Sequence, residues 1–251
     1  MKLKHFFTLL TTLSVLSVYA QRATPDHFDT KSGDLTVQPI NHATLVLGYQ
    51  HKNIYVDPTG GTDAFKGIAS PDMILITDIH GDHFDPKTLE AVNTTHATLI
   101  VPKAVADKLP PTTDKSKLVI LNNGETSNQG NIVITAMPMY NLPESATAFH
   151  TKGRGNGYVL KIGGKNIYIS GDTSDIPEMR NLKGIDIAFV CMNLPYTMDI
   201  KTAANSVLAF KPKVIYPYHY RGQDVNEFKS LVNAGDKNID VRLKNWYPAT
   251  K

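Results

Sequence analysis

Cysteine is nearly absent from this chain of 251 residues, which contains only Cys191. A single thiol excludes a framework of disulfides within the chain. Cys191 lies in the apolar run IDIAFVCMNLP. We therefore expect it to be a small buried residue of the core rather than a nucleophile.

Long apolar runs are also absent, except at the N-terminus. MKLKHFFTLLTTLSVLSVYA combines two lysines, an apolar stretch from Phe6 to Val18 and a small residue, Ala20. This pattern predicts a signal peptide of residues 1–20, cleaved after Ala20. The stretch is short for a membrane span and contains several threonines and serines, so a retained anchor is the weaker interpretation. We expect the mature protein to be exported, periplasmic or secreted, without a transmembrane segment.

Excess charge of either sign is lacking as well. Once Lys2 and Lys4 leave with the signal peptide, 24 basic side chains face 23 acidic ones. This balance does not indicate a nucleic-acid partner, and we expect a small-molecule substrate instead. No linker rich in proline, glycine or serine divides residues 21–251, which we expect to form one domain.

Strand patterns recur along the chain, with helical patterns between them. We predict strands at 34–40, 43–49, 52–58, 73–77, 98–102, 117–123, 131–139, 186–192 and 213–219, and a hairpin at 157–172. We predict helices at 86–92, 103–108, 174–182, 201–211 and 224–235, the last capped by Gly235. This order predicts an α/β fold of two packed mixed sheets with helices on their outer faces. The hairpins at 43–58 and 157–172 share a pattern, which hints at internal duplication.

The segment ILITDIHGDHFDP, residues 74–86, places two aspartates and two histidines, both metal-binding residue types, directly behind an apolar run. In an extended segment, residues two apart point the same way, so Asp78 and His80 can face one point. Gly81 allows a tight turn, after which Asp82 and His83 come round beside that point. Surface acids and histidines in a loop are the alternative. Four such residues within six positions favour a site for two adjacent metal ions.

Three further polar residues follow apolar runs elsewhere in the chain. His150 lies in AFHTKGRGNG, Asp172 in YISGDTSD and His219 in VIYPYHYR. In α/β proteins, functional sites are built where strands end, so these residues are additional candidate ligands.

The succession DIHGDH, FHTKGRGNG, GDT and PYHY resembles the metallo-β-lactamase superfamily, whose HxHxDH signature is followed by separate His, Asp and His ligands. NHATLVLGYQHKNIYVDP is similar to the opening hairpin of that superfamily, and the resemblance covers about residues 34–221. HATL is similar to the branch that contains L-ascorbate 6-phosphate lactonase-like and N-acylphosphatidylethanolamine phospholipase D-like hydrolases. The resemblance implies a four-layer αβ/βα sandwich with the site at one edge of the paired sheets.

Position by position, the resemblance implies two divalent metal ions, with Zn²⁺ as the first choice. His80 and His150 match ligands of the first ion. Asp82, His83 and His219 match ligands used around the second, and Asp172 matches the carboxylate that bridges both.

Asp78 departs from the signature, because it stands where the first histidine would be. It is an oxygen ligand, or it orients a ligand from behind, or the first metal site is weak or empty. A carboxylate at this position favours Mn²⁺ or Fe²⁺ more than an imidazole does.

Two adjacent metal ions can lower the pKa of a water molecule towards 7 and polarise a carbonyl or phosphoryl oxygen. This chemistry suits hydrolysis of an ester, lactone, amide or phosphodiester. Asp82 and Asp172 are therefore the candidate catalytic carboxylates, and Asp82 is either a ligand only or also a proton acceptor.

Other residues near the predicted ligands have two interpretations each. Asp57 could orient a ligand histidine or cap a turn. His42 could face the site or be structural. Lys152 and Arg154 could contact an anionic substrate group or be solvated. Four residues, which could shape the pocket or simply pack, are Tyr140, Asn141, Tyr196 and Tyr220.

The leading hypothesis is an exported metal-dependent hydrolase. The alternatives are a di-iron redox member of the same scaffold and a metal-binding protein without catalysis. Against the first, residues 21–251 leave little room for a flavin domain. Against the second, Asp172 and His219 are both present. The name of the superfamily is not evidence for a β-lactam substrate.

Overall fold

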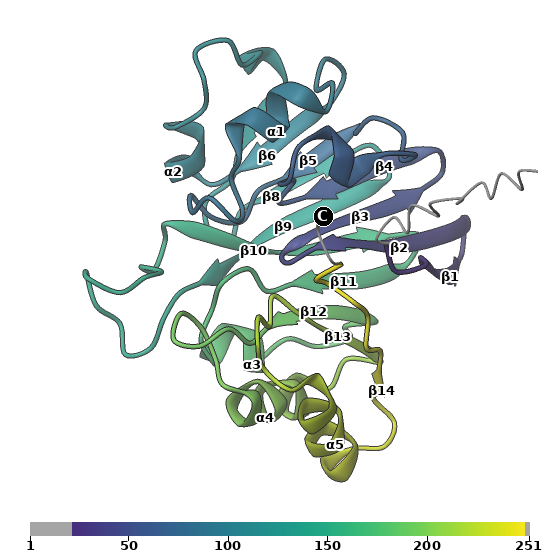
Figure 1. Cartoon of the computed structure of the whole chain (residues 1–251), viewed down its shortest axis with the longest axis vertical. Helices are drawn as coiled ribbons and strands as arrows, with labels where there is room; N and C mark the ends of the chain where they lie inside the picture. Colours follow the sequence, from purple (N-terminus) through teal and green to yellow (C-terminus); the bar gives the residue numbers. More distant parts are fainter. Residues whose placement is uncertain (1–21, 249–251) are drawn as a thin grey trace, which may run out of the picture.

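The computed structural model describes residues 22–248, so the predicted signal peptide and its cleavage site lie outside the described residues. Two seven-stranded sheets pack face to face in the centre of the molecule (Figure 1). Helices α1 (Pro86–Ala91) and α2 (Lys103–Ala106) lie beyond the first sheet. Helices α3 (Pro177–Arg180), α4 (Ile200–Phe210) and α5 (Val225–Gly235) lie beyond the second. This is the predicted α/β sandwich with helices outside.

The two sheets have the same plan. The first contains β1 (Asp26–Thr30), β2 (Gly33–Asn41), β3 (Thr44–Tyr49), β4 (Lys52–Val56), β5 (Met73–Leu75), β6 (Thr98–Val101) and β7 (Leu118–Ile120), in that spatial order. The second contains β8 (Thr126–Gln129), β9 (Ile132–Met139), β10 (Gly155–Ile162), β11 (Lys165–Ile169), β12 (Ile187–Cys191), β13 (Val214–Tyr218) and β14 (Asp240–Val241). In each, four antiparallel strands are followed by three parallel ones.

Hairpins β3–β4 and β10–β11 occupy equivalent places in the two sheets, as the hint of duplication predicts. Gln50 and His51 form the first turn with φ values of 48° and 62°. Gly163 and Gly164 form the second with 57° and 85°. Both pairs have the positive φ values that a two-residue hairpin turn requires.

Two helix predictions were wrong in detail. Helix α3 is a single turn rather than a helix over 174–182, because Pro177 starts it and holds the preceding Ile176 extended. Gly235 is the last residue of α5, and Asp236 is the C-cap. A Cβ at Gly235 would lie 2.5 Å from Leu208 Cδ1, so glycine permits the close approach of α5 to α4.

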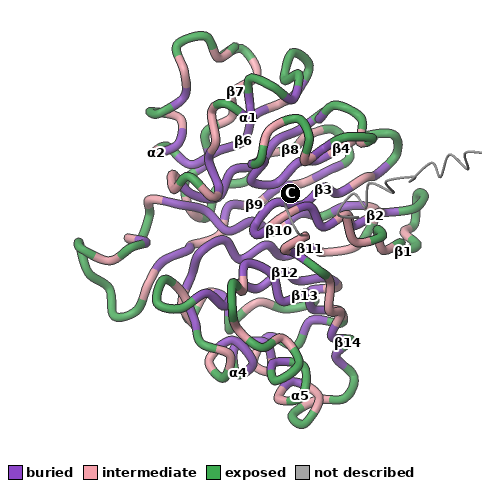
Figure 2. Tube along the Cα trace, viewed as in Figure 1, coloured by how far each residue is buried: buried purple, intermediate pink, exposed green. Residues whose placement is uncertain are grey.

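The central strands are buried along most of their length (Figure 2), and their side chains alternate between two cores. Leu45 and Leu47 of β3 face the second sheet, whereas Val46 belongs to a smaller cluster with Leu89 of α1 and Val105 of α2. This is the period of two that a strand buried on both faces requires. Cys191 is fully buried in the larger core, as predicted. Among the described residues, every helix is too short or too polar to cross a membrane.

Candidate metal centre

The predicted ligands meet at one edge of the sandwich, where the strands of both sheets end. Asp78, His80, Asp82 and His83 follow β5 of the first sheet. Three more ligands come from the second sheet: His150 from the β9–β10 loop, Asp172 from the end of β11 and His219 from the end of β13. Neither sheet alone carries the full set.

Asp57, the residue after β4, holds His83 in one orientation. Its carboxylate accepts hydrogen bonds from the backbone N–H of Thr77 at 2.7 Å and from the Thr77 hydroxyl at 2.6 Å. The same carboxylate lies 2.8 Å from Nδ1 of His83, and all three residues are fully buried. Asp57 therefore holds a proton at Nδ1 of His83 and turns the ring so that Nε2 faces the centre.

Asp172 lies between three imidazoles. Nε2 of His150 is 3.1 Å from Oδ2 of Asp172, Nε2 of His83 is 3.3 Å from Oδ2, and Nε2 of His219 is 3.4 Å from Oδ1. The three Nε2 atoms and Oδ1 of Asp172 are buried, yet none of these four atoms is aligned for a hydrogen bond. Buried polar atoms are almost always paired, so this cluster indicates a bound cation.

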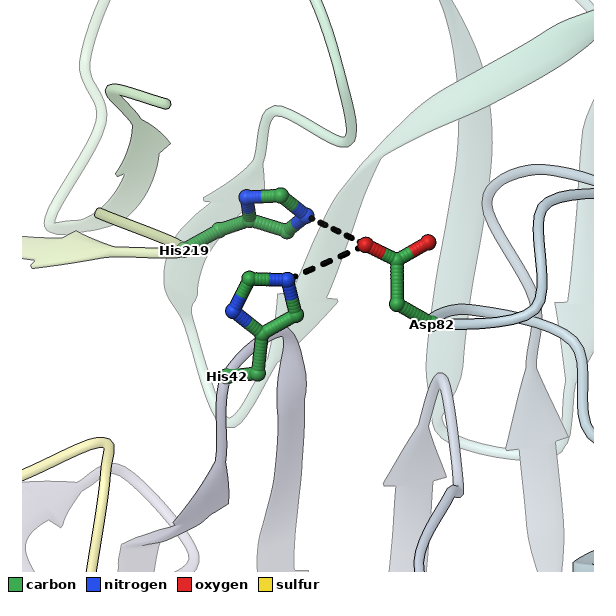
Figure 3. A group of neighbouring side chains, drawn as sticks. All are labelled: His42, Asp82 and His219. Atoms are coloured by element: carbon green, nitrogen blue, oxygen red, sulfur yellow. Dashed lines mark hydrogen bonds and ion pairs between the residues drawn. The ribbon is translucent and has the colours of Figure 1, made fainter. Parts of the chain in front are cut away.

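A second group consists of His42, Asp82 and His219 (Figure 3). Oδ2 of Asp82 lies 3.0 Å from Nε2 of His42 and 3.4 Å from Nε2 of His219. Nδ1 of His42 lies 2.7 Å from the phenol oxygen of Tyr247, which accepts a hydrogen bond from the backbone N–H of Arg221 at 2.8 Å. The phenol proton is thus directed at Nδ1, and Nε2–H of His42 donates to Asp82.

Asp78, the departure from the signature, is fully buried and paired with Arg154. Nε and one terminal nitrogen of Arg154 donate to the two carboxylate oxygens at 3.1 and 2.9 Å. Oδ2 of Asp78 also lies 2.9 Å from Nδ1 of His80 and 3.8 Å from Nε2 of His150. A carboxylate oxygen has two lone pairs, so Oδ1, which accepts from Nε of Arg154, keeps a second lone pair with which the carboxylate can bind a cation.

The backbone is strained where it presents these groups. His42, Asp57 and His219 have φ values of 53°, 45° and 48°, in a region that residues other than glycine rarely adopt. Such a residue costs ~1–3 kcal/mol and is characteristic of functional sites. Gly81 was expected to allow the turn between His80 and His83. Its φ is not positive and a Cβ there would meet open space, so the turn does not require glycine.

Neighbouring side chains of opposite charge shift the pKa values of the buried groups in the centre. Burial alone would raise the pKa of Asp172, but the neighbouring His219 and His83 rings hold it well below its usual range. Burial would lower the pKa of His83, yet the carboxylates of Asp172 and Asp57 raise it well above its usual value. Burial likewise opposes the charge of Asp82, but the neighbouring His219 ring and the hydrogen bond from His42 lower its pKa.

The donor set fits divalent metal ions. Three groups of ligand atoms converge: Asp78, His80 and His150; His83, Asp172 and His219; and His42, Asp82 and His219. Imidazole nitrogens and carboxylate oxygens suit Zn²⁺, Mn²⁺ and Fe²⁺ alike. The third group is weakened as a metal site because Nε2 of His42 carries a proton in the hydrogen-bond network above.

The remaining predicted residues surround the ligands in different ways. Asn141 accepts from the backbone N–H of His150 at 2.8 Å and lies 3.2 Å from Nδ1 of that ring, which it orients. Tyr140 is buried, and its hydroxyl donates to Glu178 at 3.0 Å.

Three further predicted residues lie on the periphery. Lys152 is tied to Glu144 and Glu178 at 3.2 and 3.4 Å. Tyr196 is about half exposed, and Tyr220 packs edge-on against Tyr247 at 5.0 Å.

Sequence reasoning missed Thr77 and Tyr247. Thr77 stands beside the motif and could have been found from its position before Asp78. Tyr247 contacts His42 from 205 residues away, through a C-terminal segment that also accepts the His42 N–H at the Trp246 carbonyl. Nothing in the pattern of NWYP signals that contact.

Comparison with known proteins agrees with this geometry. Residues 36–219 match the family model of the beta-lactamase superfamily domain. A UPF0173 metal-dependent hydrolase from Pyrococcus abyssi is 32% identical over 225 residues, which cover 83% of this chain and 96% of the relative. A crystal structure described as a candidate metal-dependent hydrolase from Parabacteroides distasonis is 40% identical, with a TM-score of 0.80 and coverage of 88% of this chain and 98% of that one.

A more distant structure supports the fold alone. It is Igni18, described as a novel metallo hydrolase from Ignicoccus hospitalis, with 23% identity, a TM-score of 0.71 and coverage of 86% and 96%. The narrower branch suggested by HATL stays a prediction. The chain belongs to the metallo-β-lactamase superfamily, in the family of UPF0173 metal-dependent hydrolases.

Proposed function

We propose that this protein is an exported hydrolase with two divalent metal ions, which cleaves an ester, lactone, amide or phosphodiester bond. Zinc is the first candidate, and Mn²⁺ or Fe²⁺ is the alternative because Asp78 supplies oxygen in place of nitrogen. The observation that carries the proposal is the set of buried, unpaired atoms around Asp172, contributed by His83, His150 and His219. A hydrolytic metal centre would supply the partner that these atoms lack.

The residues of the chain prepare this site before any ion binds. Asp57 and Asn141 fix the proton of His83 and His150 at Nδ1, so that both rings present Nε2 to the centre. His42 holds one oxygen of Asp82 at 3.0 Å, and the other oxygen stays available to accept a proton from an attacking water. When bound, divalent ions supply Lewis acidity, which lowers the pKa of water towards 7 and polarises the scissile bond.

We further propose that Asp78 is an oxygen ligand of the first ion. Paired with Arg154, its carboxylate contributes no net charge, as a neutral histidine would. The guanidinium donates to both oxygens and so fixes the orientation of the carboxylate. Residues that contact a metal ligand from the side away from the ion commonly orient it in this way.

Elemental analysis of the purified mature chain tests the metal count. We expect about two ions per chain in the wild type and about one in Asp78→Ala. The matched control is Asp240→Ala, since Asp240 pairs with Arg242 at 2.7 Å on β14 and should keep both ions. Two ions in Asp78→Ala would remove Asp78 from the ligand set. No bound metal in the wild type after metal-replete purification would refute the hydrolase.

The identity of the bound metal, its absorption spectrum and a hydrolysis assay together separate hydrolysis from redox chemistry. A pair of bound irons with a visible absorption band would favour the di-iron alternative over a zinc hydrolase. Loss of ester or lactone hydrolysis on chelation, and its return with zinc, supports the proposal.

Export is a separate proposal, because it rests on the N-terminal pattern alone. Mass spectrometry of the protein isolated from the medium or periplasm should show a chain that begins at Gln21. An intact N-terminus on a protein retained in the cytoplasm would contradict it.

A further inference from the structure

Large apolar side chains are exposed almost entirely beside the metal centre. Among the described residues, five are strongly exposed, and four of these come from the loops after β9 and β12: Leu142, Phe149, Leu194 and Tyr196, each 44–53% exposed. The fifth, Ile120, lies on β7 of the other sheet. Single exposed apolar residues are ordinary, but a gathering of them next to a site indicates a binding surface.

The two loops are joined to each other and to the centre by one side chain. The amide nitrogen of Asn141 donates to the Tyr196 carbonyl at 2.9 Å, while its oxygen accepts from the N–H of His150 at 2.8 Å. Phe149 immediately precedes His150, and its ring meets Tyr196 edge-on at 5.0 Å. The aromatic pair is therefore fixed at the rim of the centre rather than on a remote surface.

A shallow groove runs between these loops. Leu142, Pro143, Phe149 and Pro195 form its apolar walls, and Ser174 and Thr197 add small hydroxyl groups. The β9–β10 loop projects beyond the sheets and is exposed over most of its length (Figures 1 and 2). Its apolar side chains are thus accessible to a ligand that approaches the centre.

The charges around the groove argue against an anionic ligand. The cations of the β9–β10 loop, Lys152 and Arg154, were candidates for contacting an anionic substrate group. Lys152 is instead paired with Glu144 and Glu178, and Arg154 with the buried Asp78. Both cations are already neutralised by carboxylates of the chain, while the apolar surface beside them stays uncovered.

We propose that this apolar rim binds a neutral acyl or aryl group of the substrate and thereby positions the scissile bond at the metal centre. The inference rests on the proposed function and narrows it to neutral esters, lactones or amides that carry an apolar group. Phe149 and Tyr196 are then the residues that determine specificity.

Binding is tested first, without hydrolysis. The neutral fluorophore N-phenyl-1-naphthylamine is titrated into the full mature chain, both metal-free and metal-loaded. We expect Phe149→Ser and Tyr196→Ser to weaken binding about tenfold, with Ile120→Ser as the matched control at wild-type affinity. Octanamide should displace the fluorophore and acetamide should not. Equal binding in all variants, or an equal loss in Ile120→Ser, would overturn the inference.

Hydrolysis is tested second, with p-nitrophenyl esters from acetate to octanoate. In the wild type and in Ile120→Ser, kcat/KM should rise up to about fourfold per methylene, and this dependence should flatten in Phe149→Ser. If the wild type hydrolyses the esters well but kcat/KM does not change with acyl length, the proposed role of the apolar rim is wrong and the hydrolase proposal is unaffected. Fluorophore binding that depends on Phe149, in a protein that hydrolyses none of the esters, supports the rim while counting against the hydrolase.

Discussion

At the scale of single residues, the centre depends on pairs of charges that are buried together. Asp78 is fully buried and Arg154 is 20% exposed, so each compensates the other in a region of low dielectric. Removing one partner of such a pair leaves an uncompensated charge, which costs far more than the loss of a surface ion pair. The effect of removing Arg154 on the free energy of unfolding can therefore show whether a metal ion also binds Asp78.

Arg154→Met should lower the free energy of unfolding of the metal-free protein by ~3–5 kcal/mol, because the Asp78 carboxylate then lacks its counter-charge. If Asp78 is a ligand, zinc supplies a replacement charge and the loss shrinks in the metal-loaded protein. Denaturant unfolding with and without zinc measures both values.

The control for this prediction is Arg180→Met, since Arg180 pairs with Asp175 at 2.6 Å nearer the surface. Its loss should stay near 0–1 kcal/mol, at about the level of an exposed pair. An equal loss in Arg154→Met with and without zinc would show that Asp78 does not bind metal.

Tyr247 gives a second prediction at this scale. Tyr247→Phe removes the hydroxyl that directs the His42 proton toward Asp82, and we expect zinc affinity or turnover to fall about 10–100-fold. Competition with a chelating dye measures the affinity without a substrate. Tyr220→Phe is the control, because the Tyr220 hydroxyl contacts backbone groups of the C-terminal segment, such as the Lys244 carbonyl at 3.4 Å, and no candidate ligand. Similar losses in both variants would assign Tyr247 a packing role alone.

At the scale of elements, the turns that carry the ligands differ in how strictly they need glycine. Gly171 precedes Asp172 with φ 60°, and a Cβ there would lie 2.5 Å from Met139 Sδ. Gly81 lies between the candidate ligands His80 and Asp82, and a Cβ there would meet no atom within 4 Å. Gly171→Ala should therefore displace Asp172 and abolish tight zinc binding, whereas Gly81→Ala should retain it. Titration with zinc compares them, and loss of binding in both would mean that Gly81 is needed for a reason other than space.

The same scale explains how much of the fold could be predicted. The central strands were found because apolar runs such as 73–77 and 186–192 must be buried on both faces. Three strands were missed, β1, β8 and β14, and each is an edge strand. The DHFDT and TSNQ segments have too few apolar residues to signal a strand, and β14 has only two residues. Pairing with a neighbour, rather than their own composition, makes them strands.

For the site, the candidate ligands that the fold brings together could be singled out because they are contiguous or end apolar runs. Their partners could not. Arg154 meets Asp78 across 76 residues, and Tyr247 meets His42 across 205. Such contacts depend on loop conformations, which local patterns do not encode. Asp57 was the exception, because it ends a hairpin strand and could be proposed as the partner of a ligand histidine.

At the scale of the whole molecule, the metal centre joins the two halves of the duplicated plan. The first sheet supplies Asp82 and His83, and the second supplies His150, Asp172 and His219. An ion bound between them would hold the sheets together at the edge where their loops converge. Metal binding should therefore stabilise the entire fold rather than one loop.

The dependence of this stabilisation on pH follows from His83. In the metal-free protein, Asp172 and Asp57 raise its pKa despite burial, and the stability this provides is present below pH ~6.5 and lost as pH rises through the folded-state pKa. A metal ion requires the deprotonated ring, so binding releases a proton and weakens as pH falls. At a thousandfold excess over Kd, zinc should add ~4 kcal/mol, or about 8–16 °C in Tm.

Thermal unfolding with zinc and with chelator, from pH 6 to pH 8.5, should show this difference growing with pH. Calorimetric titration in two buffers of different ionisation enthalpy should count the released proton. Proton release without a rise in Tm would place the metal on a site that does not bridge the sheets. A rise in Tm that is independent of pH would show that the His83 ring is already neutral in the metal-free protein. Its single proton would then lie at Nδ1, where Asp57 accepts it.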